Sequence, residues 1–186
     1  AAVLQSMVAM MTSMTAQDPD QVERRRFLLE LLLREDNLAR AIAESRALLA
    51  HRGQAAELAE TCAMIVQRAN AEAKHWEVQS AALKLAAECF MITGDQEQAT
   101  GFLWTLTQAE ETNEEDRAWC VKQLRTILRD EGDHARPRVL LGINLARLHK
   151  DAEAIHECAL AVAVQASTEV LVAAATVLKD LLPSDD

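Results

Sequence analysis

The chain has 186 residues and a formal net charge of -10, and half of its residues are hydrophobic although only 3% are aromatic. The length fits one domain that buries a continuous core. The negative charge argues against a nucleic-acid-binding surface, because contacts with phosphates need clustered Lys and Arg. The hydrophobic residues are mainly Ala, Leu, Val, Ile and Met, a composition that favours closely packed helices over strands.

The four cysteines, at positions 62, 89, 120 and 158, lie in apolar stretches and form no C-x-x-C pair. They are expected to be buried free thiols of a protein in a reducing, cytoplasmic compartment. Two disulfides in an oxidising compartment are the alternative. No apolar run reaches the roughly 18 residues of a membrane-spanning helix. The start Ala-Ala-Val-Leu does not resemble an intact signal peptide, so we expect it to lie inside a longer chain or to follow processing.

The N-terminal segment, residues 1–16, is predicted to be an amphipathic helix, because its apolar residues between Val3 and Met14 fall on one helical face. Four of the six methionines lie in it. Since Met is flexible and polarisable, such a face can adapt to different partners. Two interpretations remain open: the helix covers the hydrophobic end of the fold, or it forms a dimer or partner contact through Met7 and Met11.

Helix start and stop signals continue along the chain. Asp18 as an N-cap and Pro19 at the first helical position predict a helix to about Arg34. Gly94 predicts a sharp left-handed turn, and Asp95 is expected to cap the helix that follows. Further helices are predicted from Leu38 to His51–Gly53, where Gly53 fits a helix C-terminus, around Cys62, from Trp76 to Ile92, and on to Ala109. The last four are predicted from a capping box at Thr112–Glu115 to Glu131–Asp133, from Pro137 to His149–Asp151, to Gln165, and from Ser167 to Leu182.

The triplet Arg24, Arg25 and Arg26 is the one dense basic stretch, and acidic residues surround it. This mixture is typical of a solvated helix face. An anion-binding site is the alternative.

The segment Ala81–Thr107 resembles a tetratricopeptide repeat. The resemblance depends on a small residue at Ala87, an aromatic at Phe90, the turn Gly94, and a second small residue at Ala99, where the second helix would cross the first. Small residues at a crossing let two helices approach closely. The resemblance implies an all-α fold, a right-handed superhelical stack of antiparallel helical hairpins (an α-solenoid) of about ten helices, over residues 17–182 with a tail at 183–186.

The same register placed on Ala41 and Ala154 gives two weaker copies of this repeat. The anchoring alanines lie 58 and 55 residues apart (99 − 41 and 154 − 99), whereas the family period is about 34. At the fourth repeat position the clear copy has Leu83, and the other two have Arg25 and Arg138. One extra helix fits each gap, so the chain is either a series of three-helix units or an array whose middle hairpins have lost the signature.

In the tetratricopeptide family the first helix of each repeat lines a concave groove. Carried onto this register, the resemblance implies these partner-binding residues: Glu23, Arg26, Glu30, Leu33, Ala81, Lys84, Glu88, Met91, Arg136, Val139, Ile143 and Ala146. The set is amphipathic and lacks a paired Lys and Asn for gripping acidic tails. It predicts that the partner is a peptide or an amphipathic helix with apolar anchors, with or without basic flanks.

The candidate chemistry is sparse. His149, His156 and Cys158 flank one predicted turn and are the best candidates for a zinc site, but a fourth ligand is missing. No nucleophile with a neighbouring base and no phosphate-binding glycine loop occurs. We therefore expect no catalytic residues, no metal and no cofactor.

The sequence thus predicts a non-enzymatic interaction scaffold or regulatory domain that holds a partner protein. A secretion-type chaperone with such repeats, which dimerises through its N-terminal helix, is the alternative. An enzyme or cofactor-dependent sensor is a third hypothesis, and it depends on the histidine and cysteine group alone.

Overall fold

The computed structural model describes residues 2–51, 53–71, 75–131, 134–164 and 167–182. In these ranges the chain is all-α, with ten helices and no strand, as the sequence predicts. None of the helices described is both long and apolar enough to cross a membrane. The helices are α1 (Ala2–Gln17), α2 (Val22–Arg34), α3 (Leu38–Leu49), α4 (Ala55–Ala71), α5 (Trp76–Thr93), α6 (Gln96–Gln108), α7 (Glu114–Glu131), α8 (Ala135–Arg147), α9 (Asp151–Ala163) and α10 (Thr168–Leu181).

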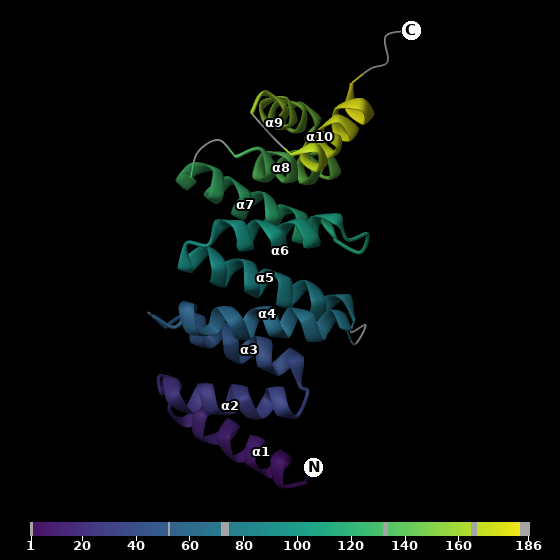
Figure 1. The fold of residues 1–186 in the computed structure, drawn as a ribbon. Helices are drawn as coiled ribbons and strands as arrows, with labels where there is room; N and C mark the ends of the chain where they lie inside the picture. Colours follow the sequence, from purple (N-terminus) through teal and green to yellow (C-terminus); the bar gives the residue numbers. More distant parts are fainter. Residues whose placement is uncertain (1, 52, 72–74, 132–133, 165–166, 183–186) are drawn as a thin grey trace. The chain divides into compact units, whose positions relative to one another are not determined.

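The chain divides into two compact units, Ala1–Asp95 and Gln96–Asp186. In the first unit, which runs from purple to teal in Figure 1, α1 packs on α2, α2 on α3, and α3 on both α4 and α5, while α4 and α5 also pack closely. Its core is mostly aliphatic, and residues of all five helices contribute to it. The largest fully buried side chains of this unit are Leu28, Leu31, Leu32, Leu48, Ile65, Leu83 and Leu85.

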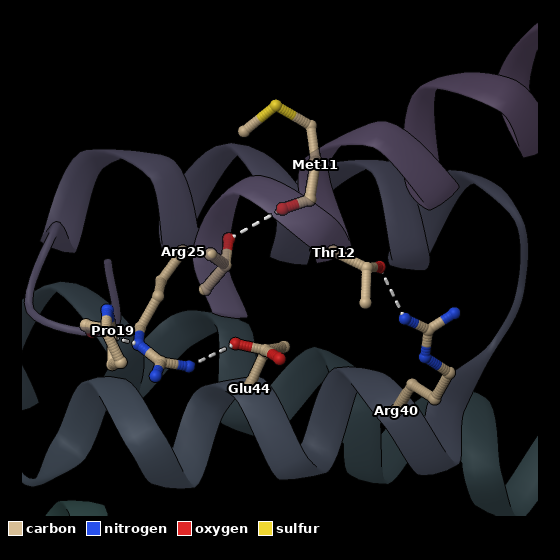
Figure 2. A network of polar contacts seen from close by, with 7 residues as sticks. Met11, Thr12, Pro19, Arg25, Arg40 and Glu44 are labelled. Atoms are coloured by element: carbon tan, nitrogen blue, oxygen red, sulfur yellow. Dashed lines mark hydrogen bonds and ion pairs between the residues drawn. The ribbon is translucent and has the colours of Figure 1, made fainter. Parts of the chain in front are cut away.

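Helix α1 buries Val8, Met11 and Thr15 and carries no charged residue over its sixteen positions. The Thr15 hydroxyl donates to the Met11 carbonyl at 2.8 Å, which satisfies a polar group inside the apolar contact. Arg40 of α3 donates to the Thr12 hydroxyl at 2.7 Å (Figure 2). α1 is therefore held both by apolar packing and by a hydrogen bond to α3.

In the second unit, α8 is the central helix, since α6, α7, α9 and α10 all pack on it. An apolar cluster joins α8, α9 and α10 and includes Val139, Cys158 and Val170. Gly142 lies where α8 approaches α9: a Cβ there would collide with the Cys158 sulfur and come within 3.2 Å of the Ala154 carbonyl oxygen. Glycine is thus the residue that lets these two helices pack so closely.

Three helices end in the same left-handed turn. Asp36, Gly94 and His149 have φ values of +58°, +81° and +57°. In each turn the next residue's amide donates to the carbonyl five positions back, at 2.9 Å in all three cases. This pattern is the Schellman motif, which satisfies carbonyls at a helix end. The predicted left-handed turn at Gly94 is confirmed, and the same turn also follows α2 and α8.

These turns lie at one position of the repeat register. Asp36, Gly94 and His149 each come five residues before one of the anchoring alanines at 41, 99 and 154, and all three alanines are fully buried. The backbone therefore repeats at spacings of 58 and 55 residues.

Two ion pairs repeat at the same register. Arg25 of α2 donates to Glu44 of α3 at 2.7 Å (Figure 2), and Arg138 of α8 donates to Glu157 of α9 at 2.7 Å. The partners are 19 residues apart in both pairs. The arginines occupy the register position that Leu83 holds in the segment Ala81–Thr107. Two of the three copies thus have an ion pair between helices where the third has an apolar residue.

The arginine triplet lies among carboxylates. Arg24 lies 3.8 Å from the Asp18 carboxylate, Arg25 pairs with Glu44, and Arg26 pairs with Glu57. Arg24 and Arg26 are 35% and 31% exposed, whereas Arg25 is only 15% exposed, so the predicted solvated face fits the outer two arginines and not Arg25.

Three predicted helix starts are wrong. α8 begins at Ala135, two residues before the predicted Pro137. α2 begins at Val22 and not at Pro19, because the Pro19 carbonyl accepts a hydrogen bond from the Arg25 side chain (2.7 Å), not from a helical amide. α7 is capped by Asn113, whose side chain accepts from the Asp116 amide at 2.9 Å. Thr112, predicted to be the cap, donates to the Leu106 carbonyl instead.

Two predicted ends also differ. α3 ends at Leu49, so Gly53, with φ of +83°, lies in the connection beyond it. α9 ends at Ala163, short of the predicted Gln165. The predicted stop at Gly132–Asp133, Gln165 itself and the tail at 183–186 lie outside the described residues.

Candidate interaction groove

Three of the four predicted groove positions on α8 are accessible to a partner. Arg136, Ile143 and Ala146 are half-buried, whereas Val139 is completely buried in the cluster between α8 and α9. The helical period places position 139 on the same side of α8 as positions 136, 143 and 146. Val139 is buried because it packs in the apolar cluster with residues of α9 and α10. Val139 is therefore left out of the contact set proposed below.

Ile143 and Ala146 line a groove of about 360 Å³ between α8 and α10, and Gln108 of α6 is also part of its lining. Ala173, Val177 and Leu181, spaced by four residues along α10, form the apolar wall opposite α8. We call this site the α8–α10 groove. Its complete lining is Gln108, Ile143, Ala146, Arg147, Ala173, Thr176, Val177, Asp180 and Leu181.

The α8–α10 groove carries one charge on each helical wall. Arg147 is the last residue of α8, and Asp180 lies in the last turn of α10. Within the described part of the chain, neither side chain forms an ion pair or hydrogen bond. A cation at the end of α8 is favoured by the helix dipole, whereas the carboxylate near the end of α10 is not.

A buried polar cluster joins α6, α7 and α8. Asn144 donates to the Thr107 hydroxyl and to the Leu140 carbonyl, both at 2.8 Å. Arg117, also buried, donates to the Thr107 carbonyl at 3.4 Å. Burial, and then the like charge of Arg147, lower the pKa of Arg117. Two arginines, Arg147 of α8 and Arg117 of α7, therefore act on each other here, and the carboxylate of Asp116 also acts on Arg117.

Arg136 lies at a second hollow of the same unit. Its guanidinium lies 5.1 Å from the centre of the Trp104 ring, a distance at which a cation and an aromatic face attract. The hollow has a volume of about 280 Å³ and is lined by Gln96, Glu97, Thr100, Ile127, His134, Arg136 and Pro137.

The predicted groove positions on α2 are partly occupied by neighbours in their own unit. Arg26 donates to the side chain of Gln54 at 3.0 Å, and the Leu33 carbonyl accepts from Arg68 of α4 at 2.8 Å. Glu23 and Glu30 are exposed. This face of α2 is thus bridged by polar side chains to the start and end of α4.

On α5 the four predicted positions share one half-exposed stripe: Ala81, Lys84, Glu88 and Met91. The residues between them include much of the core of the first unit. The stripe is consistent with the predicted amphipathic pattern, since the charged Lys84 and Glu88 lie between the two apolar members.

Helix α1 separates its two predicted contact residues. Met11 is buried against the rest of the unit, and Met7 is half-exposed. Met7 lines a shallow hollow of about 340 Å³ together with Val3 and Met10, which are 75% and 55% exposed. Only the outer face of α1 is therefore available to a partner, and Met11 is left out of that face.

The candidate zinc ligands do not converge. Cys158 is fully buried against α8, whereas His149 and His156 are exposed. Burial, and then Glu157, raise the pKa of Cys158 to about 11, so the thiol is protonated at neutral pH. No group of three or more potential metal ligands occurs in the described ranges.

The other cysteines are also buried and unbridged. The Cys89 thiol donates to the Ala55 carbonyl at 3.0 Å. A hydrogen bond to Cys89, together with burial, raises the pKa of Cys62. A reactive thiol needs a lowered pKa and access to solvent, and Cys62 has neither.

The sequence reasoning missed the second wall of the groove. It considered only the first helix of each repeat, so Arg147, Ala173, Val177 and Asp180 were not candidates. The signal that would have found the α10 members is the four-residue spacing of Ala173, Val177 and Leu181.

A scan against protein-family models gives no match, and neither curated proteins nor solved structures include a significant match to this chain.

Proposed function

We propose that the protein is a non-enzymatic interaction module that holds a peptide or helix of a partner protein. The observation that carries this proposal is the α8–α10 groove, in which two positions expected to contact a partner, Ile143 and Ala146, face a second apolar wall. Apolar clefts with a few polar groups are the usual places where proteins take ligands. Covering the accessible apolar residues of such a cleft also makes a favourable contribution to the free energy of binding.

We further propose that the helices form antiparallel hairpins stacked as a right-handed, tetratricopeptide-like solenoid. The recurrence of one left-handed turn at Asp36, Gly94 and His149 supports this, because equal turns give equal helix pairs. The repeating unit would then contain three helices. A solution scattering profile of the intact chain tests this proposal, since an extended stack and two independently placed units give different distance distributions.

Site-specific photo-crosslinking tests the proposed function. A photoreactive residue at Ala146 or at Thr176, on opposite walls of the groove, should capture the same partner in extracts of the source cell. The same residue at Lys122, an exposed position of α7, is the matched control. The identified partner is then purified, and its affinity should fall on Ala146→Trp, which fills the groove. Capture equally efficient from Lys122, or an unchanged affinity, would contradict the proposal.

A second candidate function, a secretion-type chaperone that pairs two copies through α1, is favoured by one observation. α1 carries no charge and leaves Val3 and Met10 exposed, so two copies could meet there without bringing like charges together, although the chain has a net charge of -10. Light scattering of the full chain should then give a dimer, and Met10→Glu should give a monomer. A monomeric wild-type protein rules this candidate out.

A further inference from the structure

We propose that the occupant of the α8–α10 groove is an amphipathic helix with an acidic flank toward Arg147 and a basic flank toward Asp180. This inference rests on the proposed function and adds the chemical class of the partner. It starts from three properties of the groove: its two helical walls, its apolar lining residues, which we call the floor, and the opposite charges of Arg147 and Asp180, one on each wall, which we call the rims.

The walls favour a helix over an extended strand. Both α8 and α10 use their backbone amides and carbonyls inside their own helices, so the groove offers no free edge for an extended peptide. An extended peptide would lose hydrogen bonds with water as it enters. A helical occupant satisfies its own backbone and can place side chains at i, i+3, i+4 and i+7 along the floor.

The rims select the flanks of that helix. Arg147 adds positive charge next to the buried Arg117, and Asp180 places a carboxylate near the negative end of the α10 dipole. An opposite charge on the bound helix would therefore stabilise each of these two side chains. Because the two charges stand on different walls, a uniformly acidic or basic helix would satisfy one rim and be repelled by the other.

Three labelled peptides test the inference on the full chain. Each is an amphipathic helix of roughly 15 residues with the same Leu stripe, and the flanks are Glu and Lys on opposite sides, Glu on both sides, or Lys on both sides. Affinities are measured by fluorescence anisotropy at about 150 mM salt, where distant charges are screened. A peptide with the Glu and Lys sides exchanged is not a useful control, because it could bind with its helix axis pointing in the opposite direction.

The wild-type protein should bind the mixed-charge peptide about threefold to tenfold more tightly than either uniform peptide. Arg147→Glu should shift the preference to the Lys peptide, and Asp180→Lys should shift it to the Glu peptide. Lys122→Glu, which changes the net charge as Arg147→Glu does but on α7, should leave the wild-type order intact. Circular dichroism checks that each variant remains helical.

Two results would overturn the inference. One is an order of affinities that is the same in wild-type protein and both rim variants. The other is failure of all three peptides to bind wild-type protein. In either case the proposed function is tested separately, since crosslinking from Ala146 and Thr176 can still identify a partner of another chemistry.

Discussion

Arg138 of α8 and Glu157 of α9 form an ion pair with a nitrogen–oxygen distance of 2.7 Å, and their side chains are only 16% and 20% exposed. Arg25 and Glu44 form the same pair between α2 and α3, with side chains 15% and 21% exposed. A charge in such a place depends on its partner, because water can no longer solvate it fully. Each pair should therefore fix how its two helices meet.

Removing one member of the pair should destabilise the protein. Glu157→Ala leaves Arg138 half-buried with a weaker set of partners, and we expect a loss of about 1 to 3 kcal/mol in the free energy of unfolding. A double-mutant cycle with Arg138→Ala, measured by urea unfolding, gives the coupling energy.

The matched control is Arg125 and Glu153, which pair at 2.6 Å between α7 and α9 but are 53% and 52% exposed. Their coupling should be below about 1 kcal/mol. Equal coupling in the two pairs would show that burial does not set the strength of the Arg138–Glu157 bond.

A methyl group at Gly142 should be costly. Gly142→Ala forces α8 away from Cys158 and the Ala154 carbonyl, and overpacking of this kind costs about 1 to 3 kcal/mol. Gly101→Ala on α6 is the control: its Cβ would meet no atom within 4 Å, so the better helix propensity of Ala should stabilise by roughly 0.5 to 1 kcal/mol. Adding Cys158→Ala to Gly142→Ala should recover part of the loss. Failure of the double variant to improve on Gly142→Ala would place the strain elsewhere.

The turn after α8 should become more stable with glycine. His149 has φ of +57°, where a side chain costs about 1 to 2 kcal/mol, although glycine also has more entropy to lose on folding. His149→Gly is therefore expected to raise the free energy of unfolding by about 0.5 to 1 kcal/mol. Gly94→Ala, the reverse change at the equivalent turn, should lower it. Thermal unfolding measured for both variants checks the signs, and a destabilised His149→Gly protein would mean that the imidazole makes a favourable contact that outweighs the strain.

Stability should fall at alkaline pH through Cys158. Its pKa is raised to about 11 in the folded state from an ordinary value of 9.0. Above pH 9 the unfolded chain therefore loses the thiol proton while the folded chain keeps it, which favours unfolding. This contribution is constant below pH 9 and grows as the pH rises toward 11. The slope of unfolding free energy against pH should be less steep in Cys158→Ala, whatever the absolute stability of that variant.

The sequence was sufficient to predict the helices with strong local signals. α5 begins at the predicted Trp76, Gly94 makes the predicted turn, and Ala41, Ala99 and Ala154 are buried as expected for helix crossings. The predictions failed where a side chain competes with a local signal. The Arg25 side chain takes the Pro19 carbonyl, and no local pattern at residues 18–21 indicates that bond.

Only the α8 wall of the groove could be predicted from the sequence. Ile143 and Ala146 follow from the register of α8, because a helical period fixes which residues share a face. The opposite wall depends on how α10 packs on α8. The four-residue spacing of Ala173, Val177 and Leu181 marks an apolar face of α10, but it does not indicate that this face lies opposite α8. The opposite charges of Arg147 and Asp180 become meaningful only when both helices are in place.

The three equal turns also bear on how such a chain can diverge. Asp36 and His149 keep the left-handed shape that Gly94 adopts with less strain, so the shape does not require glycine at this position. A repeat of this kind can lack the turn glycine and still have the left-handed turn. Distant copies would then be found by a small buried residue five positions beyond a tolerated Asp, His or Gly, and a search pattern that demands glycine would overlook two of the three turns in this chain.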